Sequence, residues 1–388
     1  VRPAMKAVRQ VLRVMRDDGI VPVPGPVDLR YPVTGDSLPW SGQPLTLPMT
    51  VRDIYRHTGD LDFLRFALPK LEKMLRHFAR YEDERGLLDT QRPGLPSLTL
   101  FGGWNPMLRK GVPAWFSFEY AMSLEAAAEI ADALGREDLS RPWKDRAAAV
   151  RAAARKAFWD AGSLSYFDGE AEGKLVMQFS STANGWCALG GGVRSAEAGS
   201  WAEAVRTNPA MHPPTTPYDA TTILDSFAAL DLELHFRRLL DEYWGSIVRH
   251  GEPTLPERWQ SGDATSVQYK DDLSRCHPYG SGPAYQCLQY ILGVRAAAPG
   301  WTRAVITPRA CGLSFASGRV PTPHGEIRVS WEKADVSWKL EAELPPPIQA
   351  EVVLPRLGWS DERLTLNGRT VWESLRVPAA RAQAKRCY

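Results

Sequence analysis

The chain has 388 residues, of which 44% are hydrophobic and 24% are charged. This size corresponds to about two domains of ordinary globular composition. Its 47 basic and 45 acidic side chains leave a formal charge of +2, which is too small for a surface that recruits nucleic acid or an anionic membrane. No apolar run approaches the roughly 20 residues that cross a bilayer. We therefore expect neither nucleic acid nor a membrane as a partner.

The cysteines do not indicate a metal site. There are five of them, without a CxxC pair or a zinc-like Cys/His spacing, so we expect buried free thiols and no metal or other cofactor. The chain begins at Val1 without a signal-like leader. Its sequence predicts neither the compartment nor the oligomeric state.

Apolar residues spaced by three and four predict a series of helices over most of the chain. Gly135 is expected to end one of them, and Gly/Pro-rich or polar loops separate the others. The pattern indicates seven or eight helices. The predicted stretches cover residues 64–78, 116–134, 143–158, 177–190, 219–232, 235–249 and 281–293.

The pattern changes to period two after Gly300. Apolar and polar residues alternate around Val329 and again around Trp338, and Asn367-Gly368 is typical of a type I′ hairpin turn. We therefore predict a mainly α fold followed by a small antiparallel β-sandwich. The expected divisions are a helical domain at 1–297, a β domain at 298–378 and a flexible tail at 379–388.

Several common cofactor motifs are absent from the sequence. It has no GxGxxG, no GxxxxGK[ST] and no HExxH, and Gly190-Gly191-Gly192 follows a predicted helix instead of a strand. A nucleotide-dependent enzyme is therefore disfavoured.

Four loop segments at the ends of predicted helices combine aromatic residues, acids and glycines. Because helix ends in a helical barrel share a rim, we expect these segments to lie together. An indole face stacks on the apolar face of a sugar, and a neighbouring carboxylate or amide bonds to its hydroxyls. The segments are 34–40, 100–106, 250–259 and 274–283.

Glu257 is the candidate catalytic carboxylate, because a glycosidase works with carboxyl groups and this one stands two residues before a tryptophan. Each candidate also has a structural reading. Glu257 could pair with Arg258, Asp36 could cap a helix, and His277 could serve packing as well as substrate binding. The remaining candidates for sugar binding are Trp40, Trp104, Asn105, Trp259 and Tyr279.

Taken in order, these motifs resemble those of bacterial α-L-rhamnosidases, which are six-hairpin glycosidases. The resemblance runs from about residue 10 to 345. The segments that carry it are Asp36-Ser-Leu-Pro-Trp40, Tyr55-Arg-His-Thr-Gly-Asp60, Phe101-Gly-Gly-Trp104, Thr254-Leu-Pro-Glu257, Arg275-Cys-His277, Gly282-Pro-Ala-Tyr285 and Pro299-Gly-Trp301.

The resemblance implies an (α/α)6 toroid capped by a β-sandwich. It also implies a carbohydrate substrate and inverting hydrolysis of terminal α-L-rhamnosides, with Glu257 as the general base and with Asp36 and Trp40 near the sugar.

The sequence also departs from the family pattern. Gly103 stands where the family has Asp before Trp, and Pro278-Tyr279 follows His277 instead of a small residue and Trp. The family's acidic loop with the general acid is not found before Asp36, so the chain resembles the C-terminal part of a longer enzyme. We expect a toroid that is incomplete at its N-terminus and impaired hydrolysis of natural rhamnosides.

Two other functions stay open at this stage. A trehalase- or glucoamylase-like α-glycosidase could use the same helical barrel, and a carbohydrate-binding remnant without catalysis would account for Gly103. Comparing hydrolysis of an aryl rhamnoside with that of an aryl glucoside would distinguish the two enzymes. The effect of Glu257→Gln would distinguish an enzyme from a binding protein.

Overall fold

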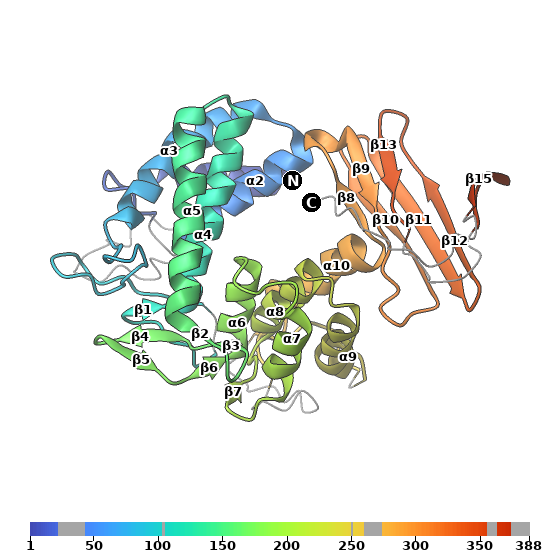
Figure 1. The fold of residues 1–388 in the computed structure, drawn as a ribbon. Coiled ribbons are helices and arrows are strands. Elements are labelled where there is room, and N and C mark those ends of the chain that lie inside the picture. The colour runs from blue at the N-terminus through green and yellow to red at the C-terminus, as the bar shows by residue number, and fades with distance from the viewer. Residues whose placement is uncertain (22–42, 103–104, 250, 260–273, 355–362, 374–388) are drawn as a thin grey trace.

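The computed structural model describes residues 1–21, 43–102, 105–249, 251–259, 274–354 and 363–373. Helices dominate up to about residue 292 and strands follow (Figure 1). The mainly helical fold with a β part after it is therefore confirmed. In chain order the α-helices are α1 (Arg2–Arg13), α2 (Leu47–Thr58), α3 (Leu61–Ala79), α4 (Ala114–Ala133), α5 (Glu137–Phe158), α6 (Ser181–Leu189), α7 (Ala198–Thr207), α8 (Pro217–Ala229), α9 (Glu233–Arg249) and α10 (Gly282–Gln286).

The helices alternate between outer and inner positions of a ring. The inner helices α2, α4, α6, α8 and α10 pack each against the next. The outer helices pack on them: α3 on α2 and α4, α5 on α4, α7 on α6, and α9 on α8. Burial agrees, because α4 is buried on nearly all sides whereas α5 buries a single stripe. Helix α1 packs on α2 and α3 as well, so the described part of the chain contains five outer and five inner helices.

Local sequence explains where the helices begin and end. Gly59 has φ 71°, a left-handed conformation that ends α2. The carboxylate of Asp60 then accepts a hydrogen bond from Phe63 N at 2.8 Å and caps α3. Gly135, with φ 70°, follows the end of α4 as predicted. Thr216 and Asp219 form a capping box at the start of α8.

Periodicity missed helices α1, α2 and α7, and it missed short strands within the helical part. One of these strands occupies the start of the helix predicted at 177–190. The strands are β1 (Val112–Pro113), β2 (Trp159–Asp160), β3 (Ser165–Tyr166), β4 (Gly169–Ala171), β5 (Lys174–Val176), β6 (Phe179–Ser180) and β7 (Met211–His212).

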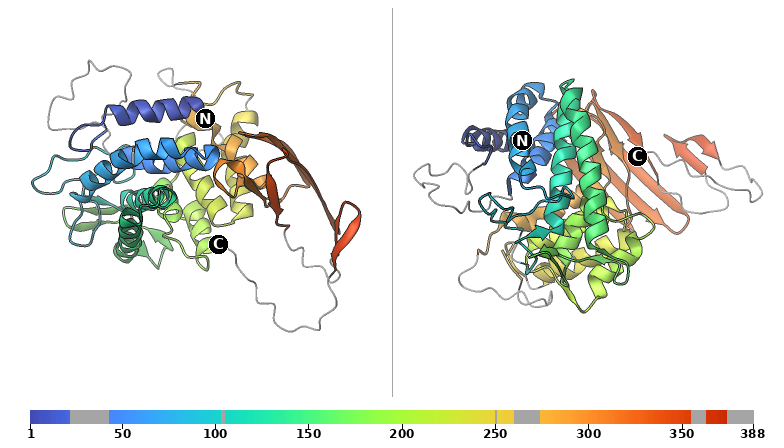
Figure 2. Two further views of the ribbon diagram at one scale, coloured as in Figure 1. Left: turned by 90° about the horizontal axis from the view of Figure 1, so that it is seen from above. Right: turned by 60° about the vertical axis from the view of Figure 1, so that its left-hand side comes forward.

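The β part consists of three small sheets, ordered β10-β11-β12, β13-β9-β8 and β14-β15. Two further views show them on one side of the helices (Figure 2). Their strands are β8 (Val294–Ala296), β9 (Arg303–Ile306), β10 (Phe315–Thr322), β11 (Gly325–Ala334), β12 (Ser337–Glu343), β13 (Gln349–Val352), β14 (Arg363–Leu366) and β15 (Arg369–Glu373).

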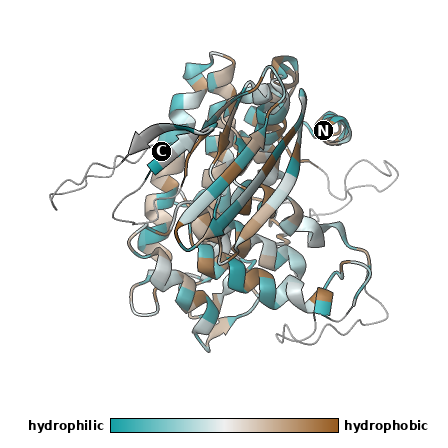
Figure 3. Ribbon diagram, turned by 90° about the vertical axis from the view of Figure 1, so that its right-hand side faces the viewer, coloured by the Kyte–Doolittle hydropathy of each residue, from teal (hydrophilic) through white to brown (hydrophobic). Residues whose placement is uncertain are grey.

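Strand β11 shows the predicted alternation. Ile327, Val329 and Trp331 are buried while Arg328 is exposed, and Figure 3 colours these strands by hydropathy. The Trp331 indole donates to Ile291 O at 3.3 Å, which ties the sheet to the helical part.

Two features refine the predicted β domain. Asn367 (φ 51°) and Gly368 (φ 75°) both have positive φ between β14 and β15, as a type I′ turn requires. However, β13 pairs with β9 in parallel, which is possible because the three strands β10–β12 form a long connection between them. The division at residues 297/298 stays a prediction, and the expected tail at 379–388 lies outside the described residues.

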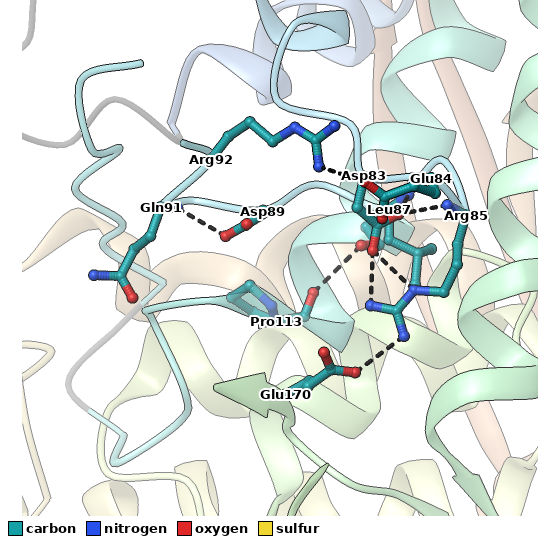
Figure 4. Close-up of polar contacts among 10 residues, drawn as sticks. Asp83, Glu84, Arg85, Leu87, Asp89, Gln91, Arg92, Pro113 and Glu170 are labelled. Carbon is teal, nitrogen blue, oxygen red and sulfur yellow. Dashed lines mark hydrogen bonds and ion pairs between the residues drawn. The ribbon is translucent and has the colours of Figure 1, made fainter. Parts of the chain in front are cut away.

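The long loop between α3 and α4 is anchored by a surface network (Figure 4). Asp83 accepts hydrogen bonds from the backbone N–H groups of Arg85 and Leu87, both at 2.9 Å. The Arg85 guanidinium also reaches Glu170 of β4 at 3.0 Å. Further along, Thr90 N donates to Gly111 O at 2.7 Å. This network fixes the stem of the loop that carries segment 100–106.

A close backbone approach joins the last helical residues to the β part. Gly293 has φ 81°, and a Cβ built on it would lie 2.1 Å from Thr307 O. Gly312 has a similar φ of 76°, but nothing lies within 4 Å of its Cβ position. A side chain at Gly293 would therefore meet both backbone strain and a steric clash, whereas one at Gly312 would meet the strain alone.

We predict that Gly293→Ala destabilises the protein by at least about 2 kcal/mol, because strain and clash add. Gly312→Ala should cost only about 1 kcal/mol, since it carries the strain alone. Denaturant unfolding of both variants measures the difference, and equal losses would contradict the role given to the Gly293–Thr307 contact.

Candidate functional site

The N-terminal ends of inner helices α4, α6 and α8 meet at one end of the ring. Strand β6 leads directly into α6, and β7 is followed by a short turn and then by α8. These two strands pair in parallel. Asn105 joins the same elements, because its Nδ2 donates to Thr182 Oγ1 at 3.1 Å and to Pro213 O at 2.9 Å. Ala114 N, at the start of α4, donates to Asp168 O at 2.9 Å.

Segments 251–259 and 274–281, the described parts of two predicted loops, pair with each other at this end. Glu257 N donates to Ser274 O at 3.0 Å, and Ser274 N donates to the Glu257 Oε2 at 3.2 Å. His277 N donates to Leu255 O at 2.9 Å. The pair reaches α8 through Trp259 N, which donates to Thr215 O at 3.2 Å.

Packing fixes the second of these segments. The Trp244 indole of α9 donates to Gly280 O at 2.7 Å. A Cβ on Gly280 would lie 2.7 Å from Leu255 Cβ, so only glycine allows the two segments this contact. The partly exposed Glu257 is therefore held on a doubly anchored loop.

An aromatic row extends from this loop to α8. The ring of His277 lies 5.3 Å from that of Tyr279, and Tyr279 lies 5.1 Å from Tyr218 in an edge-to-face contact. Tyr279 is 57% exposed. It thus offers an accessible aromatic face at the site, while Tyr218 contacts it from α8.

Two predicted sugar-binding residues are buried. The Trp259 side chain is 3% exposed and packs 5.0 Å from Tyr243 and 5.6 Å from Trp244, measured between ring centroids. Asn105 is fully buried by the contacts given above. Both hold the site's framework, and their contact with a sugar stays a prediction. Asp36, Trp40 and Trp104 lie outside the described residues.

The structure adds buried acids that sequence reasoning missed. Asp168 accepts hydrogen bonds from the Ser180 backbone and hydroxyl and from Gln178. Asp219 accepts from Thr215 and Thr216. Burial raises the pKa of both carboxyls, and these hydrogen bonds oppose the rise.

Arg109 supplies positive charge near these two acids. Its guanidinium donates to Asn105 O at 2.7 Å. Burial lowers the Arg109 pKa, and the charges of Asp219 and Asp168 oppose that effect. Asp168, Asp219 and Arg109 thus form a charged framework behind the paired loops.

Glu119 of α4 differs from those acids. Its side chain is 3% exposed, and in the described part of the chain no hydrogen bond or ion pair is made to its carboxyl. Burial raises its pKa to about 8, so the group holds its proton at neutral pH. No sequence signal marks it, since one Glu in an alanine-rich helix reads as a surface residue.

Metal and membrane features were also sought among the described residues. There, no group of three or more His, Cys, Asp or Glu side chains is arranged to hold a metal ion. None of the helices there combines the length and apolar character that a membrane crossing requires.

Two family models match the chain. One, described as the bacterial alpha-L-rhamnosidase 6 hairpin glycosidase domain, matches residues 2–186. The other, the bacterial alpha-L-rhamnosidase C-terminal domain, matches residues 293–367. An α-L-rhamnosidase of Streptomyces avermitilis is 25% identical over 327 residues, which cover 81% of this chain and 29% of that protein.

Solved structures of similar fold point the same way. The GH78 family rhamnosidase of Bacillus sp. GL1 has a TM-score of 0.76 at 21% identity, covering 91% of this chain and 36% of its own. The S. avermitilis α-L-rhamnosidase complexed with L-rhamnose has a TM-score of 0.69 at 20% identity. The match covers 95% of this chain and 35% of that one. The chain therefore spans about a third of these relatives, and the likeness to the structures establishes the six-hairpin fold.

The raised pKa of Glu119 has a consequence for stability. The folded state binds the proton more tightly than an unfolded chain with a pKa of 4.5, so stability falls as the pH rises from 4.5 to about 8. Glu119→Gln removes this loss, and we expect it to raise the free energy of unfolding by about 3 kcal/mol at pH 7 and by little at pH 4.5.

Urea unfolding at the two pH values measures this effect. Glu125→Gln, on the same helix, removes an exposed carboxylate that pairs with Arg151, and it should change stability by less than about 1 kcal/mol. A Glu119→Gln variant that is no more stable than the wild type at pH 7 would contradict the burial argument.

Proposed function

The chain belongs to the bacterial α-L-rhamnosidase family, and on that premise we propose that it is a glycoside hydrolase acting on terminal α-L-rhamnosides. Relatives named α-L-rhamnosidase support the reaction class, and one solved relative holds L-rhamnose. Residues 1–297 form the catalytic unit in this proposal, and residues 298–378 form the accompanying β domain.

Glu257 acts as the general base in this proposal. The observation that carries it is the pairing of segments 251–259 and 274–281, which holds the Glu257 carboxylate at the N-terminal ends of the inner helices by a hydrogen bond from Ser274 N. In an inverting reaction this carboxylate removes a proton from water as the water attacks the anomeric carbon. A positioned base is worth about 10² to 10⁴ in rate.

The sugar then lies against the aromatic row. Tyr279 supplies the exposed ring, and His277 beside it supplies hydrogen bonds to hydroxyls. Asp36, Trp40, Trp104, Asn105 and Trp259 complete the proposed sugar-binding set, with Asn105 and Trp259 acting from behind the loops that they hold.

We expect Glu257→Gln to lower kcat/KM for an aryl α-L-rhamnoside by at least about 100-fold, because the amide cannot accept the proton of water. Glu252→Gln, on the same segment, is the matched control and should retain wild-type activity. NMR of the first product should show the β anomer, as inversion requires.

The outcome separates the candidate functions. Turnover of an aryl α-glucoside in preference to the rhamnoside would favour a trehalase- or glucoamylase-like enzyme. Binding of L-rhamnose without turnover of either glycoside would indicate a binding protein. Equal activity of wild type and Glu257→Gln would place the base elsewhere.

A further inference from the structure

Two segments that carry the family resemblance meet where the helical ring adjoins the β part. Residues 55–60 include the last turn of α2, and residues 299–301 form the turn before β9. This turn packs against α2, and Figure 1 shows the end of α2 beside it. A Cβ built on Gly59 would lie 3.4 Å from the Gly300 Cα, so the two backbones are in direct contact. We call this contact between residues 57–59 and 299–301 the joint.

The Trp301 indole ties the two sides of the joint together. Its Nε1 donates to His57 Nδ1 at 3.1 Å, and the two rings meet edge to face with their centroids 6.0 Å apart. Trp301 is buried, so the bond is shielded from water. An indole N–H can only donate, and the Nδ1 that it meets must therefore be an unprotonated acceptor. The hydrogen bond thus requires a neutral His57 with its proton on Nε2.

The turn is strained where it carries this indole. Gly300 has φ 72° and Trp301 has φ 60°, and a bulky residue stays in the left-handed region only when its surroundings hold it there. The burial of the Trp301 ring and its bond to His57 do so. A second histidine, His324 of the turn between β10 and β11, bonds through Nε2 to Gly300 O at 2.8 Å. Because a carbonyl accepts, this ring donates, and it keeps its bond when it is protonated.

We propose that His57 and Trp301 form an acid-sensitive latch that holds the joint between the helical ring and the β part closed. A proton added to His57 Nδ1 faces the indole N–H, so two donors meet and the hydrogen bond is lost. The strained turn then relaxes away from α2 and the joint opens. When the proton leaves, Nδ1 accepts the indole N–H again and the latch closes. The latch does not depend on the proposed function.

The surroundings of His57 favour the neutral ring. Burial lowers its pKa, and the positive charge of the Val1 amino group lowers it further. Neighbouring charges are engaged elsewhere, since Arg56 pairs with Glu129 of α4 at 2.6 Å and the Asp60 carboxylate caps α3. In the described part of the chain no carboxylate forms an ion pair with His57. A pKa below the ordinary 6.5 means that this stabilisation is complete above pH 6.5 and is lost as the pH falls below it.

Hydrogen exchange of backbone amides measures the opening of the joint. The N–H groups of Ala297 and Ala298 donate to Arg303 O, and that of Trp301 donates to Ala298 O, so peptides over residues 297–301 report on the turn. One pH unit below 6.5, an open joint holds about ten protonated His57 rings for each neutral one. We therefore expect exchange in the wild type, corrected for its intrinsic rate, to become about 10-fold faster from pH 7.5 to pH 5.5.

Three variants separate the latch from a general loss of stability in acid. His57→Asn places an amide oxygen near the position of Nδ1, where it accepts the indole N–H and takes up no proton, so exchange should change by less than about 2-fold over the same range. Trp301→Phe has no donor for His57, and its exchange should be fast at both pH values. His324→Gln is the matched control, because its amide still donates to Gly300 O, and it should show the wild-type acceleration.

Nitrogen NMR of the histidine rings tests the latch in the wild type alone. The ring that lies close to the Trp301 indole proton should have an unprotonated Nδ1 at pH 7.5 and a titration midpoint below 6.5. A midpoint at or above that value would overturn the latch. So would wild-type exchange that does not accelerate in acid, an equal acceleration in His57→Asn, or a lost acceleration in His324→Gln.

Discussion

The burial of the inner helices is the constraint on which the rest of the structure depends. A helix surrounded by others cannot leave polar groups to water, so each must find a partner or lose its charge. At the ends of α6 and α8 the chain meets this demand with side chains. Asn184 bonds to Tyr166 and Ser180, Asp168 bonds to Ser180, and Asp219 caps α8. These bonds also draw the loops before the helices to one end, where the site forms.

The same constraint separates the two glutamates chemically. Glu257 lies on a partly exposed loop with one backbone hydrogen bond, whereas Glu119 is enclosed between helices and its pKa is raised by burial. Burial thus keeps the Glu119 carboxyl protonated at neutral pH and lowers the stability of the fold there.

How much the sequence predicts depends on how each element is buried. Helix α5 buries one stripe, so its periodicity is clear, and the alternation of β11 is equally direct. Helices α2 and α7 bury only three and four residues, so their periodicity is weak. The parallel pairing of β9 with β13 joins residues far apart in sequence. Segments around Glu257 and His277 could be found because their glycines, prolines and aromatic residues are unusual together. Glu119 could not, because the apolar residues on all faces of α4 indicate a buried helix but not that this carboxyl lacks a partner.

Trp259 illustrates the limit of residue type as a guide to role. A tryptophan near a glutamate is typical of a sugar site, yet here Tyr243 and Trp244 of α9 enclose the ring of Trp259. Tyr279, further along the chain, has the exposed ring instead. The packing of α9 thus decides which aromatic face is accessible, while Trp244 also bonds to Gly280 beside Tyr279. One outer helix therefore buries one aromatic residue of the candidate site and positions another, so the proposed recognition of a sugar depends on helix packing as much as on the loops.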